Sequence, residues 1–242
     1  MKPVSLFIPC IVDQWVPRVG MATADLLRHI GCSPFYRPEQ TCCGQVLYNS
    51  GHVREARKLA RRFIRIFEND AAIVSPSASC VHMVRRHYPV LFEGAPVWRR
   101  RAESLADRVF ELCEFLVDHM AAADVGARFS GRAAYHESCS HRYGLNISDQ
   151  PGRLLAAVEG LEIVDMEGAD ICCGFGGRFS VDYPDISGAM AADKAANFVA
   201  SGADVLVLCE PGCLLNIGGY VSRNYPEKKV VHMAPFLVEN LT

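Results

Sequence analysis

Four cysteines recur in the same order and at almost the same spacing in each half of this 242-residue chain. Each set consists of a lone cysteine, an adjacent pair followed by glycine, and a second lone cysteine. Between the first cysteine and the pair lie 31 residues in one half and 32 in the other; between the pair and the last cysteine lie 36 and 39. Such agreement indicates an internal repeat. The two sets are Cys10, Cys42, Cys43 and Cys80, and Cys139, Cys172, Cys173 and Cys213.

Apolar runs of strand length precede the first and the last cysteine of each half, and stretches with helix-like apolar spacing lie between them. This alternation predicts an α/β fold with mainly parallel strands. Functional groups gather at the carboxyl ends of such strands, so each cysteine set should meet at one sheet edge. We expect strands at 4–8, 35–36, 71–74, 133–136, 161–164 and 204–208, and helices at 17–30, 52–68, 151–158 and 186–200.

The repeat predicts two tandem, pseudo-repeated α/β halves, the first at residues 1–120 and the second at 121–242. Each half is long enough to bury a core of its own. The segment 89–130 is expected to connect them and to carry a helix near Leu105–Met120.

Eleven cysteines are many for a chain whose beginning does not resemble a secretory signal, because residues 13–15 are polar or bulky where a cleavage site would need small residues. We therefore expect a cytoplasmic protein, in which clustered cysteines indicate metal binding or redox chemistry. The formal charge of −2 offers no field for nucleic acid, and no apolar run has the length of a membrane span. Cys32 and Cys113 have no counterpart in the other half and are expected in the core.

Thiolates are soft ligands that suit iron and sulfide, so the two sets favour iron–sulfur clusters, up to two per chain. Gly44, Gly174 and the pair Gly176–Gly177 would let the backbone approach a cluster closely. Two alternatives stay open: a zinc site, and redox chemistry in which Cys42–Cys43 and Cys172–Cys173 form vicinal disulfides. Adjacent cysteines chelate tetrahedral zinc awkwardly, and disulfide chemistry leaves the lone cysteines unexplained.

The repeated motifs resemble those of the CCG-domain iron–sulfur family, which includes the CCG-domain subunit of heterodisulfide reductase, the iron–sulfur subunit of glycolate oxidase and the lactate-utilisation protein A family. The last of these is the most similar. The resemblance extends from Val4 to Leu241 and is carried by the segments 7–10, 40–45, 75–80, 135–139, 171–177 and 211–217.

The resemblance implies a non-autonomous oxidoreductase subunit that transfers electrons through 4Fe–4S clusters held by all eight cysteines. Its partners would be the other iron–sulfur subunits of a complex that oxidises L-lactate, or a similar 2-hydroxy acid, together with an electron acceptor. Two alternative functions stay open. In one, the CCG sites themselves act as a thiol/disulfide reductase. In the other, the chain is a zinc-binding or thiol-redox module.

The chain departs from the family pattern at one point in each half. Heterodisulfide reductase relatives bind a non-cubane 4Fe–4S cluster with five cysteines, whereas Met83 and Asn216 stand here in place of the fifth. A four-thiolate cluster and a non-cysteine ligand both stay open. The additional candidates are Cys209, which is more simply a buried strand cysteine, and His136, which is more simply a structural hydrogen-bonding residue.

Overall fold

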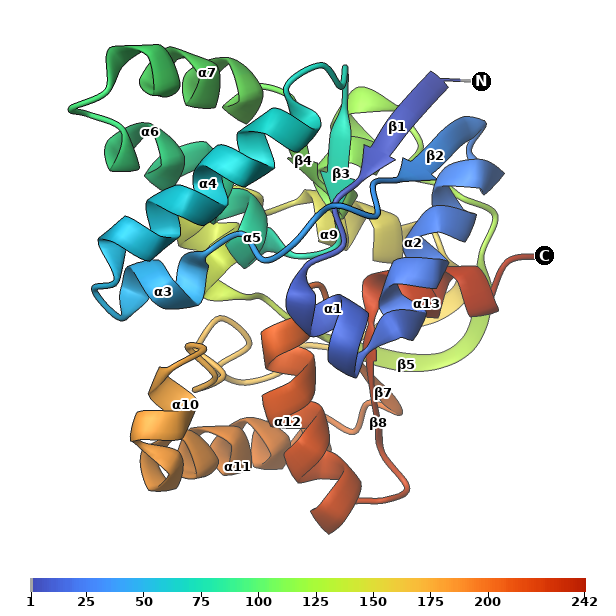
Figure 1. Cartoon of the computed structure of the whole chain (residues 1–242). Helices are drawn as coiled ribbons and strands as arrows, with labels where there is room; N and C mark the ends of the chain where they lie inside the picture. Colours follow the sequence, from blue (N-terminus) through green and yellow to red (C-terminus); the bar gives the residue numbers. More distant parts are fainter. Residues whose placement is uncertain (1) are drawn as a thin grey trace. The chain divides into compact units, whose positions relative to one another are not determined.

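The computed structural model describes residues 2–242 and divides into two compact units, one ending at Phe115 and the other beginning at Leu116. Each unit contains one four-stranded sheet in which every strand pair is parallel (Figure 1). The expected fold class, two α/β halves with parallel strands, is confirmed. The expected boundary between residues 120 and 121 stays a prediction.

The first sheet has the strand order β2-β1-β3-β4, with β1 and β3 at its centre. Ser5 of β1 lies beside Phe35 of β2 on one side and Ile73 of β3 on the other. The strands are β1 (Lys2–Leu6), β2 (Cys32–Tyr36), β3 (Ile73–Ser75) and β4 (Val109–Glu111). The helices are α1 (Cys10–Trp15), α2 (Pro17–His29), α3 (Gln45–Asn49), α4 (Val53–Phe67), α5 (Ala78–His82), α6 (Tyr88–Leu91), α7 (Pro96–Ala106) and α8 (Leu112–Glu114), with a π-helical turn η1 (Met83–His87) between α5 and α6.

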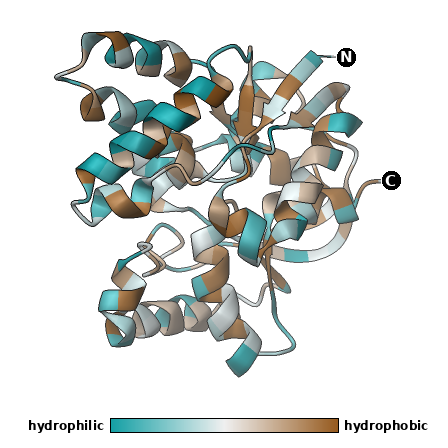
Figure 2. Ribbon diagram, in the orientation of Figure 1, coloured by the Kyte–Doolittle hydropathy of each residue, from teal (hydrophilic) through white to brown (hydrophobic). Residues whose placement is uncertain are grey.

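Aromatic side chains fill the space between β1 and α4. Phe7, directly after β1, is fully buried, and its ring centroid lies 4.7 Å from that of Phe63 and 6.0 Å from that of Phe67, both on α4. The rings meet edge to face, the arrangement that aromatic quadrupoles favour. Hydrophilic and hydrophobic residues alternate along α4 in Figure 2, as expected of a helix with one buried face.

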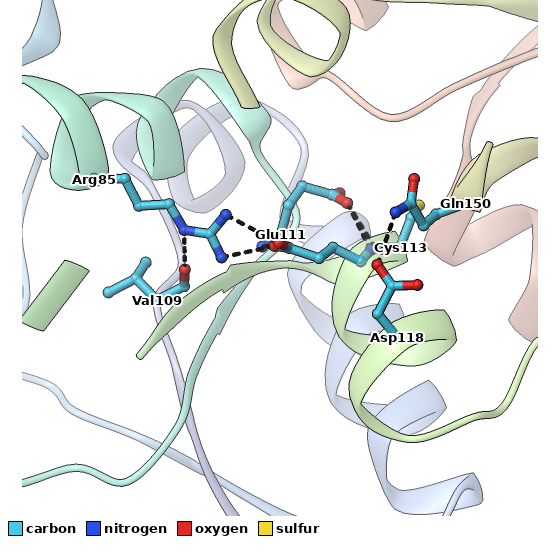
Figure 3. A network of polar contacts seen from close by, with 7 residues as sticks. Arg85, Val109, Glu111, Cys113, Asp118 and Gln150 are labelled. Carbon is cyan, nitrogen blue, oxygen red and sulfur yellow. Dashed lines mark hydrogen bonds and ion pairs between the residues drawn. The ribbon is translucent and has the colours of Figure 1, made fainter. Parts of the chain in front are cut away.

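The expected helix over Leu105–Met120 is wrong. This stretch contains the end of α7, strand β4, helix α8 and the π-helical segment η2 (Phe115–His119). Glu111 begins α8 by accepting the N–H of Cys113 at 2.7 Å, while Arg85 of η1 donates to the Val109 carbonyl at 2.6 Å (Figure 3). These bonds interrupt the helical pattern and hold β4 against the first sheet.

The second sheet repeats the first, with the order β6-β5-β7-β8 and β5 and β7 at its centre. At the start of α9, Gln150 donates to Asp118 of η2 at 2.7 Å (Figure 3). The strands are β5 (Arg128–His136), β6 (Glu159–Ile163), β7 (Val205–Leu208) and β8 (Lys229–His232). The helical elements are η3 (Ser140–Leu145), α9 (Gln150–Ala156), α10 (Phe179–Asp182), α11 (Pro184–Ala200), α12 (Pro211–Asn224) and α13 (Met233–Glu239).

The core of the second unit includes cysteine side chains as well as apolar ones. Cys173 and Cys213 belong to the same buried cluster as Phe198 of α11 and Leu206 of β7. Between Lys2 and Thr242, none of the helices combines the length and hydropathy that crossing a bilayer requires.

Replacing Phe7 with alanine should lower the free energy of unfolding by about 3–5 kcal/mol, because it leaves a cavity in the aromatic cluster. Urea unfolding followed by circular dichroism measures this loss. Met21→Ala on α2 is the control, because Met21 is 63% exposed and its truncation should cost less than about 0.5 kcal/mol. Equal losses in the two variants would contradict the assigned role of Phe7.

Candidate metal centres

The cysteines of each half gather at the carboxyl ends of the two central strands. Cys10 begins α1 just beyond β1, and Cys80 lies in α5 just beyond β3. Cys139 follows β5, and Cys213 lies in the first turn of α12, after β7. The chain leaves β1 toward β2 on one side while β3 lies on the other, which makes the crevice between them a topological switch point.

In the first unit the adjacent pair completes a row of four sulfurs. Cys42 and Cys43 lie in the loop that precedes α3. The Cys43 thiol donates to Cys80 Sγ at 3.4 Å, and Cys10 donates to Cys42. The Gly44 N–H points at Cys42 Sγ, 3.3 Å away. The structure therefore brings together the four cysteines that the sequence groups in this half.

The second unit repeats this row with the same donors and acceptors. The Cys173 thiol donates to Cys213 Sγ at 2.9 Å, and Cys139 donates to Cys172. The Gly174 N–H lies 3.4 Å from Cys172 Sγ. Agreement at this level of detail extends the repeat from cysteine spacing to the hydrogen bonds of the sulfurs.

Hydrogen bonding separates the first row into thiols and a thiolate. The pKa of Cys42 is lowered from the ordinary 9.0 to about 3, first by the hydrogen bond from Cys10, then by that from Cys43, with a smaller contribution from the Gly44 N–H. The pKa values of Cys10 and Cys43 are raised, first by the hydrogen bond of each with Cys42, then in Cys43 by its bond with Cys80, and further because both thiols lose solvation.

The second row carries two such thiolates. The pKa of Cys172 is lowered to about 2, first by the hydrogen bond from Cys139 and then by that from Cys173. The pKa of Cys213 is lowered to about 5, first by the bond from Cys173, while burial opposes the shift and the nearby His136 supports it. Thiolates are the form in which cysteine binds metal, so both rows are ready to do so.

Gly174 allows α11 to pass close to the second cysteine pair. Its φ is +80°, in the left-handed region that favours glycine, and a Cβ there would lie 2.9 Å from Cβ of Met190. In the first unit Gly44 has a φ of +86°, and a Cβ would lie 3.5 Å from Cβ of Leu59 on α4. The expected backbone freedom is therefore used at both turns, more strictly at the second.

Two different side chains hold the carbonyl of the second paired cysteine. In the second unit Asn216 donates to the Cys173 carbonyl at 2.7 Å. In the first unit Met83, at the matching position, is fully buried in the core, and the Tyr88 hydroxyl donates to the Cys43 carbonyl at 2.9 Å. Sequence reasoning missed Tyr88, because it lies eight residues after Cys80 and has no counterpart in the repeat.

His136 lies beside the second row, at the end of β5. Its Nδ1 is 2.9 Å from the Ala169 carbonyl oxygen, which agrees with the structural hydrogen bond expected from the sequence. A ring nitrogen of His136 also lies within 4.8 Å of the sulfurs of Cys173 and Cys213, and all three residues are buried. Among residues 2–242, this is the one group of three such donor atoms that lie so close together.

The remaining cysteines lie in the core. Cys32, Cys113 and Cys209 are fully buried. Cys209 directly follows β7, and its sulfur accepts a hydrogen bond from the Tyr135 hydroxyl at 3.7 Å. No disulfide joins any cysteine in residues 2–242, a range that includes all eleven.

Paired α/β units that each gather four cysteines at a switch point define a two-domain cysteine-rich protein. The cysteine-rich domain named CCG matches residues 4–85 and 133–218, and the chain belongs to this family.

Within that class, the chain is a homologue of lactate utilization protein A, as its motifs suggested. It is 46% identical to the lactate utilization protein A of an Exiguobacterium species over 243 residues, covering 100% of this chain and 99% of that one. It is 44% identical to that of Geobacillus kaustophilus over 234 residues, covering 97% and 98% of the two chains.

Among solved structures, a hypothetical protein from Helicobacter pylori matches with a TM-score of 0.71 at 10% identity. The match covers 99% of this chain and 49% of that one, so this chain spans about half the length of the solved protein. At this level of identity the likeness shows the fold alone.

Replacing Gly174 with alanine should lower the free energy of unfolding by about 1–3 kcal/mol, because a side chain at this φ is strained and meets Met190. Thermal unfolding of the metal-free chain measures the loss. Gly188→Ala is the control: Gly188 lies within α11 with open space around it, so alanine should be neutral or stabilising by up to about 1 kcal/mol. Unchanged stability in Gly174→Ala would contradict the close approach of α11.

Cys172 of the reduced, metal-free chain should react with iodoacetamide at almost the same rate at pH 5 as at pH 8. Its pKa of about 2 keeps it a thiolate throughout this range, and the side chain is exposed. An ordinary thiol, with a pKa of about 8.5, should slow by several hundredfold over the same interval. Mass spectrometry of the modified peptide gives the rate, and the urea-unfolded chain is the control. A pH dependence like that of the unfolded chain would contradict the hydrogen-bonded row.

Proposed function

We propose that this chain is an iron–sulfur electron-transfer subunit with one cluster site in each unit. The observation that supports it most strongly is the repeated row of four thiols, with the same donors and acceptors, at the switch point of both sheets. A sulfur-only row in a reducing compartment suits iron and sulfide better than it suits calcium, magnesium or manganese.

The residues present fit such a group. Cys10, Cys42, Cys43 and Cys80 would hold it in the first unit, and the matching four cysteines in the second. When bound, an iron–sulfur cluster supplies reversible one-electron transfer. The left-handed glycine after each pair lets the covering helix, α4 or α11, pack close to the loop that carries the paired cysteines.

The chain's own groups prepare the site electrostatically. The N–H groups of Gly44 and Gly174 already point at the thiolate sulfurs of Cys42 and Cys172, and such bonds offset the negative charge of a thiolate-ligated centre. Tyr88 and Asn216 anchor the carbonyls of the paired cysteines and thereby fix the loops. Half of each row is buried: Cys43 and Cys80 in the first, and Cys173 and Cys213 in the second.

The pathway assignment rests on the relatives. They are named for lactate utilization and match this chain from end to end. We therefore place the chain in a multi-protein system that oxidises L-lactate, or a similar 2-hydroxy acid, to the keto acid. In this system other iron–sulfur subunits and an electron acceptor are its partners.

One observation favours a second candidate, a thiol/disulfide reductase. Cys172 is an exposed thiolate that borders a cavity of about 300 Å³, whose wall also includes Ile171, Met190 and Lys194. A small disulfide could reach the sulfur there. Turnover of disulfides by the isolated, fully loaded chain would favour this second function, and inertness would leave the electron-transfer role.

Anaerobic purification followed by iron and acid-labile sulfide analysis tests the proposal. We expect about eight irons per chain, as two four-iron clusters require, and about half as many in Cys42→Ser or in Cys172→Ser. Cys32→Ser is the matched control, since Cys32 lies outside both rows and should leave the iron content unchanged. Stoichiometric zinc, or free thiols without iron after reconstitution, would overturn the proposal.

A further inference from the structure

The two cysteine rows are alike, but one pair of neighbouring residues differs between the units. Phe7 lies three residues before Cys10, and His136 lies three residues before Cys139. On the covering helices, α4 in one unit and α11 in the other, Phe63 corresponds to Lys194. The match follows from the contacts of the turn glycines, since Gly44 faces Ala56 and Leu59 where Gly174 faces Ser187 and Met190.

In the first unit neither of these two positions offers an atom that could bind metal. Phe7 is fully buried and packs edge to face on Phe63, 4.7 Å between ring centroids. In the second unit both phenyl rings are replaced by nitrogen-bearing side chains, His136 for Phe7 and Lys194 for Phe63. Lys194 is 2% exposed and donates to the Gly168 carbonyl, while His136 is fully buried beside the adjacent carbonyl, that of Ala169.

The Ala169 carbonyl determines which nitrogen of His136 carries the proton. A carbonyl oxygen only accepts hydrogen bonds, so Nδ1 must be the donor across the 2.9 Å contact. In the neutral ring, Nε2 then carries a free lone pair. A backbone carbonyl on one ring nitrogen is also the usual partner of a histidine that binds metal through the other.

Nε2 is buried and has no nitrogen or oxygen hydrogen-bond partner among residues 2–242. The ring interacts with the sulfur of Cys213, whose pKa it helps to lower. Burying a polar atom without a hydrogen-bond partner is destabilising, so its presence calls for an explanation. The sulfurs of Cys173 and Cys213 supply one, because the three donor atoms all lie within 4.8 Å of one another and are close enough to share one metal ion.

We propose that Nε2 of His136 is a metal ligand of the second site, beside the cysteine sulfurs. The two sites of the chain then differ in their ligands: cysteines alone bind the metal at the first site, and cysteines and one histidine bind it at the second. That the metal is iron rests on the proposed function. That His136 is the ligand does not. Imidazole is neutral where thiolate is negative, so the second site holds less ligand charge than a site with one more cysteine.

Pulsed EPR on the anaerobically reconstituted and reduced full-length chain tests the ligand directly. We expect a ¹⁴N hyperfine coupling of the size given by bound imidazole, replaced by a ¹⁵N coupling when the histidines are labelled. His136→Gln should abolish it, and so should His136→Phe, which copies the first unit. His82→Gln is the control: His82 is two residues from Cys80, but its ring lies against His87, 4.9 Å away.

Titration of the metal-free chain with Co²⁺ alone gives a second readout that needs no iron. We expect His136→Gln to weaken Co²⁺ binding at the second site by at least about tenfold, and His82→Gln to leave it unchanged. The comparison is made in a Cys42→Ser background, which disables the first site, and circular dichroism verifies the fold.

The outcomes separate this proposal from the proposed function. Clusters without nitrogen coupling, or a coupling that survives in His136→Gln, would overturn the histidine ligand and leave the electron carrier intact. Failure to take up iron, combined with Co²⁺ binding that depends on His136, would overturn the electron carrier and keep the histidine ligand. Co²⁺ affinity unchanged in His136→Gln would also count against the ligand, and would indicate that His136 only interacts with the sulfur of Cys213.

Discussion

The pairing of β1 with β3, and of β5 with β7, decides where every cysteine of the two rows lies. In parallel neighbours the carboxyl ends open at the same edge, and crossovers that leave in opposite directions keep the space between them clear. The lone cysteines come from those two strands, and the pair comes from the loop after the outer strand. The row therefore depends on the pairing of the central strands: if they separated, the cysteines would no longer lie together, even with every cysteine still present.

The same fold surrounds the two cysteine rows with different side chains. Phe7 and Phe63 make the first setting apolar, so added negative charge there finds little to offset it. His136 and Lys194 make the second setting polar, and the nearby cysteine row, together with Asp170, counteracts the burial that lowers the pKa of Lys194. If both units hold the same kind of centre, an electron should rest more readily on the second.

The sequence predicted the cysteine rows, every strand except β4 and β8, and the helices α2, α4, α9 and α11, because repeated spacing and strand-length apolar runs are local signals. It could not predict β4, because Leu105, Val109, Leu112 and Leu116 follow a helical period. The pairing of Val109 with Ile73 and the hydrogen bonds of Glu111 and Arg85 override that period. The side chains that surround the cysteine rows were harder to predict from the sequence than β4. Lys194 looks like one more residue of a long helix, since its importance depends on which β-strand that helix covers.

The π-helical turn between α5 and α6 explains how Tyr88 comes to serve the first row. On a regular helix a residue eight places after Cys80 is rotated by about 80° from it, whereas the seventh is within about 20°. A wider turn takes up roughly one extra residue and so returns the eighth residue to the face of the cysteine. The regular α12 has no such turn and uses Asn216, one turn from Cys213. One extra residue in a helix thus changes which side chain points at the cysteine row, without breaking the helix.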